Sequence, residues 1–186
     1  MRARTVVVLG LLTLALCAGA WLALREDGAR TAFARADTRP FAGLSARAAE
    51  LRVLRLSGPG TTVHIERHGD GWQVREKHGY AADTARVRDV LAGLAALRLV
   101  EQRTDDPARY AALDLADPQA TSGGALELTL LGEADAVLAQ VLLGKARAVR
   151  GGGTRQRYVR LADDARTWLA DAPLDPPRDP SLWLDR

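Results

Sequence analysis

The chain contains little cysteine, lysine and histidine. Its 186 residues include one cysteine, Cys17, two lysines, Lys77 and Lys145, and three histidines. A single cysteine excludes an internal disulfide framework and any metal site that needs several cysteines. The basic charge is therefore carried almost entirely by arginine.

A strong basic excess is also missing. The formal net charge is +3, but Arg2 and Arg4 precede an uncharged stretch, and the residues after position 24 include 24 basic and 23 acidic side chains. Domains that bind duplex nucleic acid usually concentrate basic charge. We therefore expect no nucleic-acid partner.

The short motifs of catalytic sites are absent as well. The sequence LLGKA at 142–146 lacks the earlier glycine of a phosphate-binding loop, and Ala146 stands where that loop needs Ser or Thr. No serine lies in the context of a nucleophile elbow. The acidic pairs at 105–106 and 163–164 each precede a segment that reads as helical, where N-capping explains them. We expect no enzyme activity, no catalytic residues and no cofactor.

The three histidines, His64, His68 and His78, gather within residues 63–80, and Glu66 lies between the first two. Such a pair could chelate a metal on a helix, but a β-branched start and a glycine-rich end disfavour a helix here. On a strand, residues four apart lie about 13 Å from each other, too far to share one metal. We therefore expect no metal site.

Three runs of alternating apolar and polar residues, at 51–57, 61–67 and 72–76, predict antiparallel strands. GPG separates the first two runs, and GDG separates the second from the third. An Asp-Gly pair between such runs is the strongest short-range hairpin signal. We expect Asp70 and Gly71 to be the two turn residues.

That turn determines which residues face each other: Glu66 faces Arg75, and Arg67 faces Val74. One face of the hairpin is then apolar and the other is solvated. The apolar side chains are Val63, Ile65, Trp72 and Val74. The solvated side chains are His64, Glu66, Arg75 and Lys77.

Helices are predicted outside the hairpins. Apolar residues repeat at three- and four-residue spacing between residues 84 and 97, behind a cap at Asp83 or Thr84. Shorter helical segments are expected at 42–50, 106–113 and 179–186. Further strands are expected at 98–102, 125–132, 136–144 and 155–162, with 166–170 either a strand or a helical turn. This order predicts an α+β fold of antiparallel β-meander and hairpins with two or three short helices.

The N-terminal segment, residues 5–24, contains no charge. As a helix it would span about 30 Å, the thickness of a bilayer core. Trp21 lies near its far end, where an interfacial aromatic residue is expected. These features predict a transmembrane signal anchor at 1–24, a juxtamembrane linker at 25–41 and an α+β domain at 42–186.

A cleaved signal peptide is the alternative, because AGA at 18–20 resembles a small-residue cleavage site. The apolar stretch continues to Leu24, which favours the anchor. Arginine counting would place the C-terminal side in the cytoplasm, but long domains translocate largely regardless of charge. We expect a single-pass protein of the inner (cytoplasmic) membrane with a periplasmic C-terminal domain.

Five segments carry a family pattern: GDGWQV, GYAADTARVRDVLAGLAALRLVE, DDPARYAALDLADP, VLLGK and YVRL. Together they resemble the bacterial domain of unknown function 4340 (DUF 4340), over about residues 41–186. Proteins of that family are typically encoded beside ABC transporter components of the gliding-motility type. The resemblance therefore implies a membrane-anchored accessory protein near a transporter, and it implies no catalytic residues.

One stretch is strongly basic: residues 145–160 carry six cations, and no acid occurs from 136 to 162. Such a patch could bind an anionic partner. The other interpretation is a flexible loop between two strands, which the glycines at 151–153 support, because charge runs are usually solvated. The candidate partner-binding residues are Lys145, Arg147, Arg150, Arg155, Arg157 and Arg160.

Our leading hypothesis is a non-catalytic envelope protein that serves as an accessory or interaction subunit of an ABC-type transport complex. The alternative is a module that binds an anionic envelope polymer or lipid through residues 145–160.

Overall fold

The computed structural model describes residues 34–147 and 155–185. The predicted anchor at 5–24 and the candidate residue Arg150 therefore lie outside the described residues. Among the helices within the two described ranges, none is both long and apolar enough to cross a membrane.

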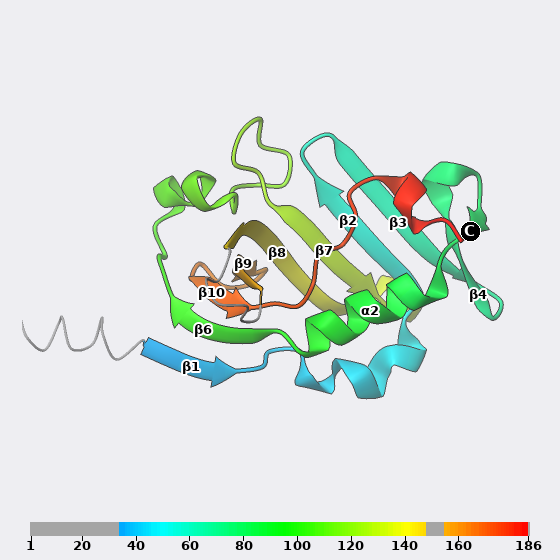
Figure 1. The fold of residues 1–186 in the computed structure, drawn as a ribbon, viewed down its shortest axis with the longest axis horizontal. Coiled ribbons are helices and arrows are strands. Elements are labelled where there is room, and N and C mark those ends of the chain that lie inside the picture. Colours follow the sequence, from blue (N-terminus) through cyan, green and yellow to red (C-terminus); the bar gives the residue numbers. More distant parts are fainter. Residues whose placement is uncertain (1–33, 148–154, 186) are drawn as a thin grey trace, which may run out of the picture. The chain divides into compact units, whose positions relative to one another are not determined.

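Ten strands form one sheet, in the order β1-β6-β10-β9-β8-β7-β2-β3-β4-β5 (Figure 1). Every neighbouring pair from β6 to β5 is antiparallel. The strands are β1 (Ala34–Thr38), β2 (Val53–Gly58), β3 (Thr61–His68), β4 (Gly71–Val74), β5 (Tyr80–Ala81), β6 (Arg98–Gln102), β7 (Leu126–Leu131), β8 (Val137–Arg147), β9 (Gln156–Leu161) and β10 (Thr167–Asp171).

The longest described helix is α2 (Thr84–Ala95), and the Asp83 side chain caps it by accepting hydrogen bonds from the backbone N–H groups of Ala85 and Arg86. The remaining helical segments are short 3-10 helices. They are η1 (Ala42–Glu50), η2 (Arg75–Lys77), η3 (Pro107–Arg109), η4 (Ala111–Leu113), η5 (Glu133–Asp135) and η6 (Pro180–Trp183). The antiparallel α+β architecture predicted from the sequence is confirmed.

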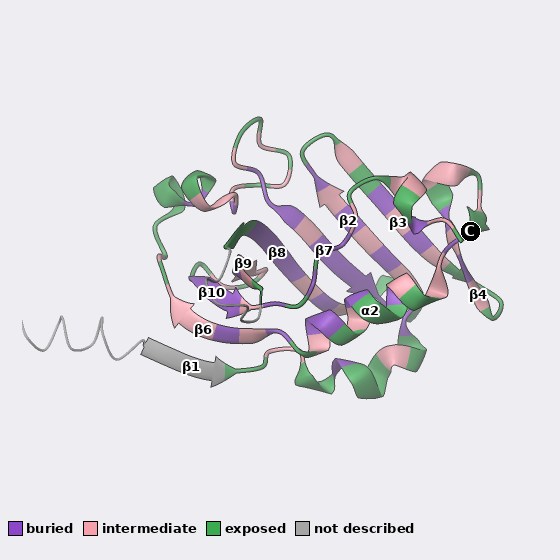
Figure 2. Cartoon of the chain, in the orientation of Figure 1, coloured by how far each residue is buried: buried purple, intermediate pink, exposed green. Residues whose placement is uncertain are grey.

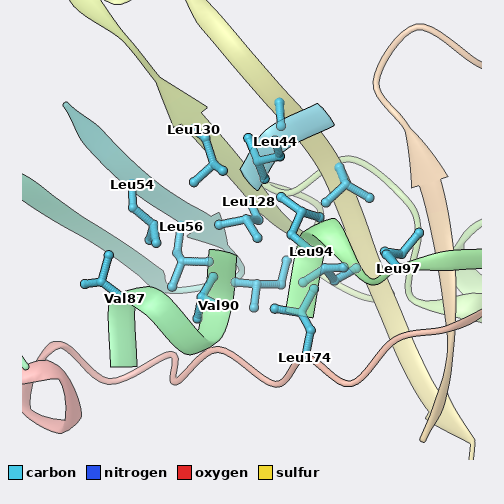
Figure 3. Packing of buried hydrophobic residues seen from close by; sticks show 14 of the residues in the cluster. Leu44, Leu54, Leu56, Val87, Val90, Leu94, Leu97, Leu128, Leu130 and Leu174 are labelled. Carbon is cyan, nitrogen blue, oxygen red and sulfur yellow. The ribbon is translucent and has the colours of Figure 1, made fainter. Parts of the chain in front are cut away.

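The main core lies between α2 and one face of the sheet (Figures 1 and 3). Helix residues Val87, Val90 and Leu94 point toward the leucines of β2 and β7, as the close-up shows. Each of these side chains is almost completely buried, and full burial of an aliphatic side chain stabilises a fold by roughly 1.5–3 kcal/mol. The labelled members of the cluster are Leu44, Leu54, Leu56, Val87, Val90, Leu94, Leu97, Leu128, Leu130 and Leu174.

A smaller core lies on the opposite face of the sheet. Tyr110 and Leu115, from the segment of η3 and η4, pack with Leu142 of β8. The segment comes so close to the strand that a Cβ on Gly144 would lie 2.3 Å from the Leu113 carbonyl oxygen. The glycine of LLGKA therefore has a packing role at this position.

The hairpin register differs from our prediction. The turn residues are Gly69 and Asp70, and Glu66 faces Gln73 rather than Arg75. Gly69 has φ +58°, a conformation that glycine adopts without the Cβ penalty of other residues. The expected turn at Asp70-Gly71 is wrong because the glycine before the aspartate takes the left-handed position.

The predicted faces of this hairpin are nevertheless correct on the apolar side. Val63, Ile65, Trp72 and Val74 are all buried, and the stripes of buried and half-buried residues are visible in Figure 2. The strand ends earlier than expected, since residues 75–77 form η2 instead of continuing β4. Arg75 still forms an ion pair with Glu66, although it is not the cross-strand partner of that residue.

Two strands had no counterpart in the sequence prediction. β1 falls inside the range 25–41 that we expected to be a linker, and the two-residue β5 follows η2. Residues 167–171 form a strand, which settles the choice between a strand and a helical turn there.

The acidic pairs have different local roles. Asp106 caps η3 by accepting the backbone N–H of Ala108, as predicted. Asp164 accepts the backbone N–H of Arg166 in a turn that leads into β10, so the helical segment expected after residues 163–164 is wrong.

Candidate interaction surfaces

The basic stretch is mostly a hairpin rather than a loop. Lys145 and Arg147 lie at the end of β8, Arg157 and Arg160 lie in β9, and Arg155 directly precedes β9. Strand residues three positions apart point to opposite faces, so Arg157 and Arg160 do not lie on one side of the sheet.

Two of the cations converge on a single carboxylate in the C-terminal segment. Arg155 and Arg157 each donate to Asp175, at 2.9 Å. Arg157 is 8% exposed, and the carboxylate that compensates its charge is that of Asp175. The pair ties the segment that follows β10 to the hairpin.

Two further cations contact the segment on the opposite face. The Lys145 ammonium donates to the Ala112 carbonyl at 2.9 Å and lies 3.8 Å from the Asp114 carboxylate. The Arg160 guanidinium lies over the Tyr110 ring, 4.8 Å from its centroid. These partners of Lys145 and Arg160 lie 30 or more residues away in the sequence. The residues around the basic stretch therefore do not indicate them.

A polar surface covers the other side of β2 and β3 from α2. Arg55 lies between Thr129 of β7 and His64 of β3 in the sheet register. Arg55 and His64 are half-buried, whereas their strand neighbours Leu54 and Ile65 are completely buried in the main core. We define Arg55, His64, Glu66, Gln73 and Thr129 as the polar face; Thr129 is buried and the other four are half-buried.

One carboxylate fastens η2 to this polar face. Glu76 accepts the backbone N–H of His64 at 2.8 Å, and its other oxygen lies 2.6 Å from Nδ1 of the His64 ring. Burial alone would raise the pKa of Glu76, but the hydrogen bonds from the backbone and ring of His64 outweigh it and lower the pKa.

The polar face also contains a second network of hydrogen bonds. Glu127 of β7 accepts hydrogen bonds from Thr129, at 3.1 Å, and from the amide of Gln140 in β8. These bonds join β7 and β8 above the sheet and satisfy polar groups that the surrounding side chains shield from water.

The histidines occupy separate positions. His64 and His68 lie on β3, and His78 is the left-handed residue that ends η2. In the described ranges, no group of three or more His, Cys, Asp or Glu residues could hold a metal ion.

A cleft of about 490 Å³ opens where β8 begins and β9 ends. Its apolar walls include Phe41, Leu138 and Leu161, which pack partly against the main core. Val137 also lines the cleft, and 58% of its surface is exposed. Sequence reasoning missed this cleft because its walls come from segments almost 100 residues apart.

The rim of the cleft is polar and contains Asp163, Asp164 and Arg166. The Arg166 guanidinium donates to both oxygens of Asp164, at 2.9 and 3.0 Å, and lowers the pKa of that carboxyl. Asp163 is exposed beside this pair. The rim therefore carries a net negative charge.

These features define an α+β domain whose wide antiparallel sheet has the main core on one face and both the polar face and a smaller core on the other. The model of one family, described as a domain of unknown function (DUF4340), matches residues 72–186, which is more than half of the chain. The chain belongs to this family. Neither the curated proteins nor the solved structures that were compared contain a match.

Proposed function

We propose that the protein is a non-catalytic, single-pass envelope protein that acts as an accessory or interaction subunit of an ABC-type membrane transport complex. The supporting observation is the polar face, where half-buried side chains lie on the side of the sheet opposite α2. A domain with an apolar core on one face of its sheet and polar groups on the other is suited to docking onto a partner.

Two features support the proposed transport context: the resemblance to a family expected beside ABC transporter components, and the apolar stretch at 5–24. A domain tethered to a membrane meets a membrane-embedded partner at high local concentration, which strengthens a modest interaction. A polar docking surface of this kind gives specificity and fast association more than high intrinsic affinity.

The test is purification of the full-length, tagged chain from membranes of its own source, followed by quantitative mass spectrometry. ABC transporter subunits should be enriched relative to an unrelated single-pass protein that carries the same tag. Enrichment equal to that of the unrelated protein would contradict the proposal.

Binding to an anionic envelope polymer or lipid is the second candidate. Arg147 and Arg155 are exposed near the end of the β8–β9 hairpin, although Arg155 also pairs with Asp175. If these residues and Arg150 bind an anionic surface, association of the full chain with cell-wall sacculi should weaken as salt rises. Replacing Arg147, Arg150 and Arg155 with serine should then reduce the association without unfolding the domain, and unchanged association would eliminate this candidate.

A further inference from the structure

Three large hydrophobic residues in the described part of the chain are strongly exposed: Tyr80, Val137 and Leu182. Of these, Val137 lines the cleft between the start of β8 and the end of β9. An exposed apolar side chain at the mouth of an apolar cleft offers surface that a partner could remove from water.

Two of the three charged residues that line the cleft are acidic. Asp163 and Asp164 lie on the rim, and only Asp164 has its carboxylate bound to Arg166. Glu133 and Asp135 precede Val137 in the exposed turn between β7 and β8, and Glu133 pairs with Arg52. The rim therefore complements a cation, in a chain whose net charge is +3.

We propose that this cleft docks a protein segment in which a bulky apolar side chain is flanked by lysine or arginine. The apolar side chain enters between Phe41, Val137 and Leu161. The flanking cation lies beside Asp163, where an exposed carboxylate attracts it without a strong desolvation cost. The cleft meets the polar face at Gln140, which lines the cleft and donates to Glu127, and it adds a contact of different chemistry.

Phe41, three residues after the end of β1, forms one wall of the cleft. Only the source of the docking segment rests on the proposed transport function. Recognition of an apolar and basic segment is a property of the cleft itself.

The test uses the full-length chain in detergent and a fluorescent hexapeptide with a central Phe-Leu pair flanked by two basic residues on each side. Two control peptides replace either the Phe-Leu pair with Ser-Ser or the basic residues with glutamates. The first peptide should bind, more weakly as salt rises, and both controls should lose most of the binding.

Variants of the protein then locate the binding site. Val137→Lys should weaken binding about tenfold, because it removes apolar contact and adds a like charge. Asp163→Lys should weaken it about fivefold, as expected for an exposed ion pair. Leu182→Lys is the matched control, since Leu182 is also exposed but lies outside the cleft, and binding should stay unchanged. Thermal unfolding of each variant shows that the fold is kept.

Binding that is equal for all three peptides, or unaffected by Val137→Lys, would overturn the inference. Self-association of the chain that disappears in Val137→Lys, without peptide binding, would also overturn it by making a second copy the occupant. If the peptide binds as expected but no transporter subunit co-purifies with the chain, the proposed function fails and the docking inference stands.

Discussion

The two faces of the sheet differ most clearly along β3. Val63 and Ile65 are completely buried against the main core, whereas His64 and Glu66, between and beside them, are half-buried on the polar face. Both sets share one backbone, because successive residues of a strand point to opposite sides. One face therefore carries the apolar core while the other carries polar side chains on the same strand.

The energetic character of the two faces also differs. The core face depends on apolar area removed from water, which is cumulative and has little directional requirement. The polar face depends on particular pairs, such as Glu76 with His64 and Glu127 with Thr129. Substitutions should therefore affect stability strongly on the first face and association on the second.

The largest expected effect is on the core face. Leu94→Ala in α2 should lower the free energy of unfolding by about 2–5 kcal/mol, because a fully buried leucine leaves a cavity between the helix and the sheet. Urea unfolding followed by tryptophan fluorescence measures the loss. Leu182→Ala, at an exposed leucine, is the control and should change stability by less than about 0.5 kcal/mol. Equal effects of the two changes would contradict this assignment of the core.

The second effect concerns the ion pairs of Asp175 with Arg155 and Arg157, which join the C-terminal segment to the β8–β9 hairpin. Asp175→Ala should cost about 1–3 kcal/mol, since it removes a partner from the buried Arg157 guanidinium. Asp89→Ala, an exposed position on α2, is the control. Double substitution of Asp175→Ala with Arg157→Met should recover part of the loss, and a failure to recover would show that the buried charge is not its origin.

The core and its caps could be read from the sequence because they depend on local patterns. Spacing identified α2 and placed its cap at Asp83 or Thr84, of which the structure shows Asp83, and alternation identified the buried face of the β3–β4 hairpin. The cross-strand partners there were wrong because the turn lies one residue earlier. Such a shift displaces each partner by two residues, which is the side-chain period, so the faces stay the same.

The candidate sites were harder to predict because they depend on distant segments. Nothing near Arg157 in the sequence indicates that Asp175 compensates its charge, and nothing near Lys145 indicates Asp114. The order of the strands in the sheet was hard to predict for the same reason. Paired residues of β2 and β7 lie 70 or more positions apart in the sequence. Patterns of one segment carry no information on such pairings.

A smaller effect on stability is expected at low pH. Hydrogen bonds from His64 hold the pKa of Glu76 below its usual value of 4.5, so this carboxylate contributes stability above that pH. The contribution should be lost as the pH falls from 4.5 through the lower folded-state pKa. Glu76→Gln should make the stability of the chain less dependent on pH in this window, as followed by urea unfolding at a series of pH values. An unchanged pH dependence would show that the interaction contributes little.

The smallest effect on stability is expected on the polar face. Arg55→Glu should change the free energy of unfolding by less than about 1 kcal/mol, because Arg55 is only half-buried and lies outside the core. Thermal unfolding compares it with Arg88→Glu, an exposed change on the outer side of α2. A loss as large as that of Leu94→Ala would mean that the polar face is part of the core.

The most direct test of the docking role is quantitative co-purification of ABC transporter subunits with three full-length chains: the parent, Arg55→Glu and Arg88→Glu. Arg55→Glu should lose most of the transporter recovered with the parent, while Arg88→Glu should retain it and both variants should remain folded. Equal recovery with all three chains, or none with the parent, would contradict docking through the polar face.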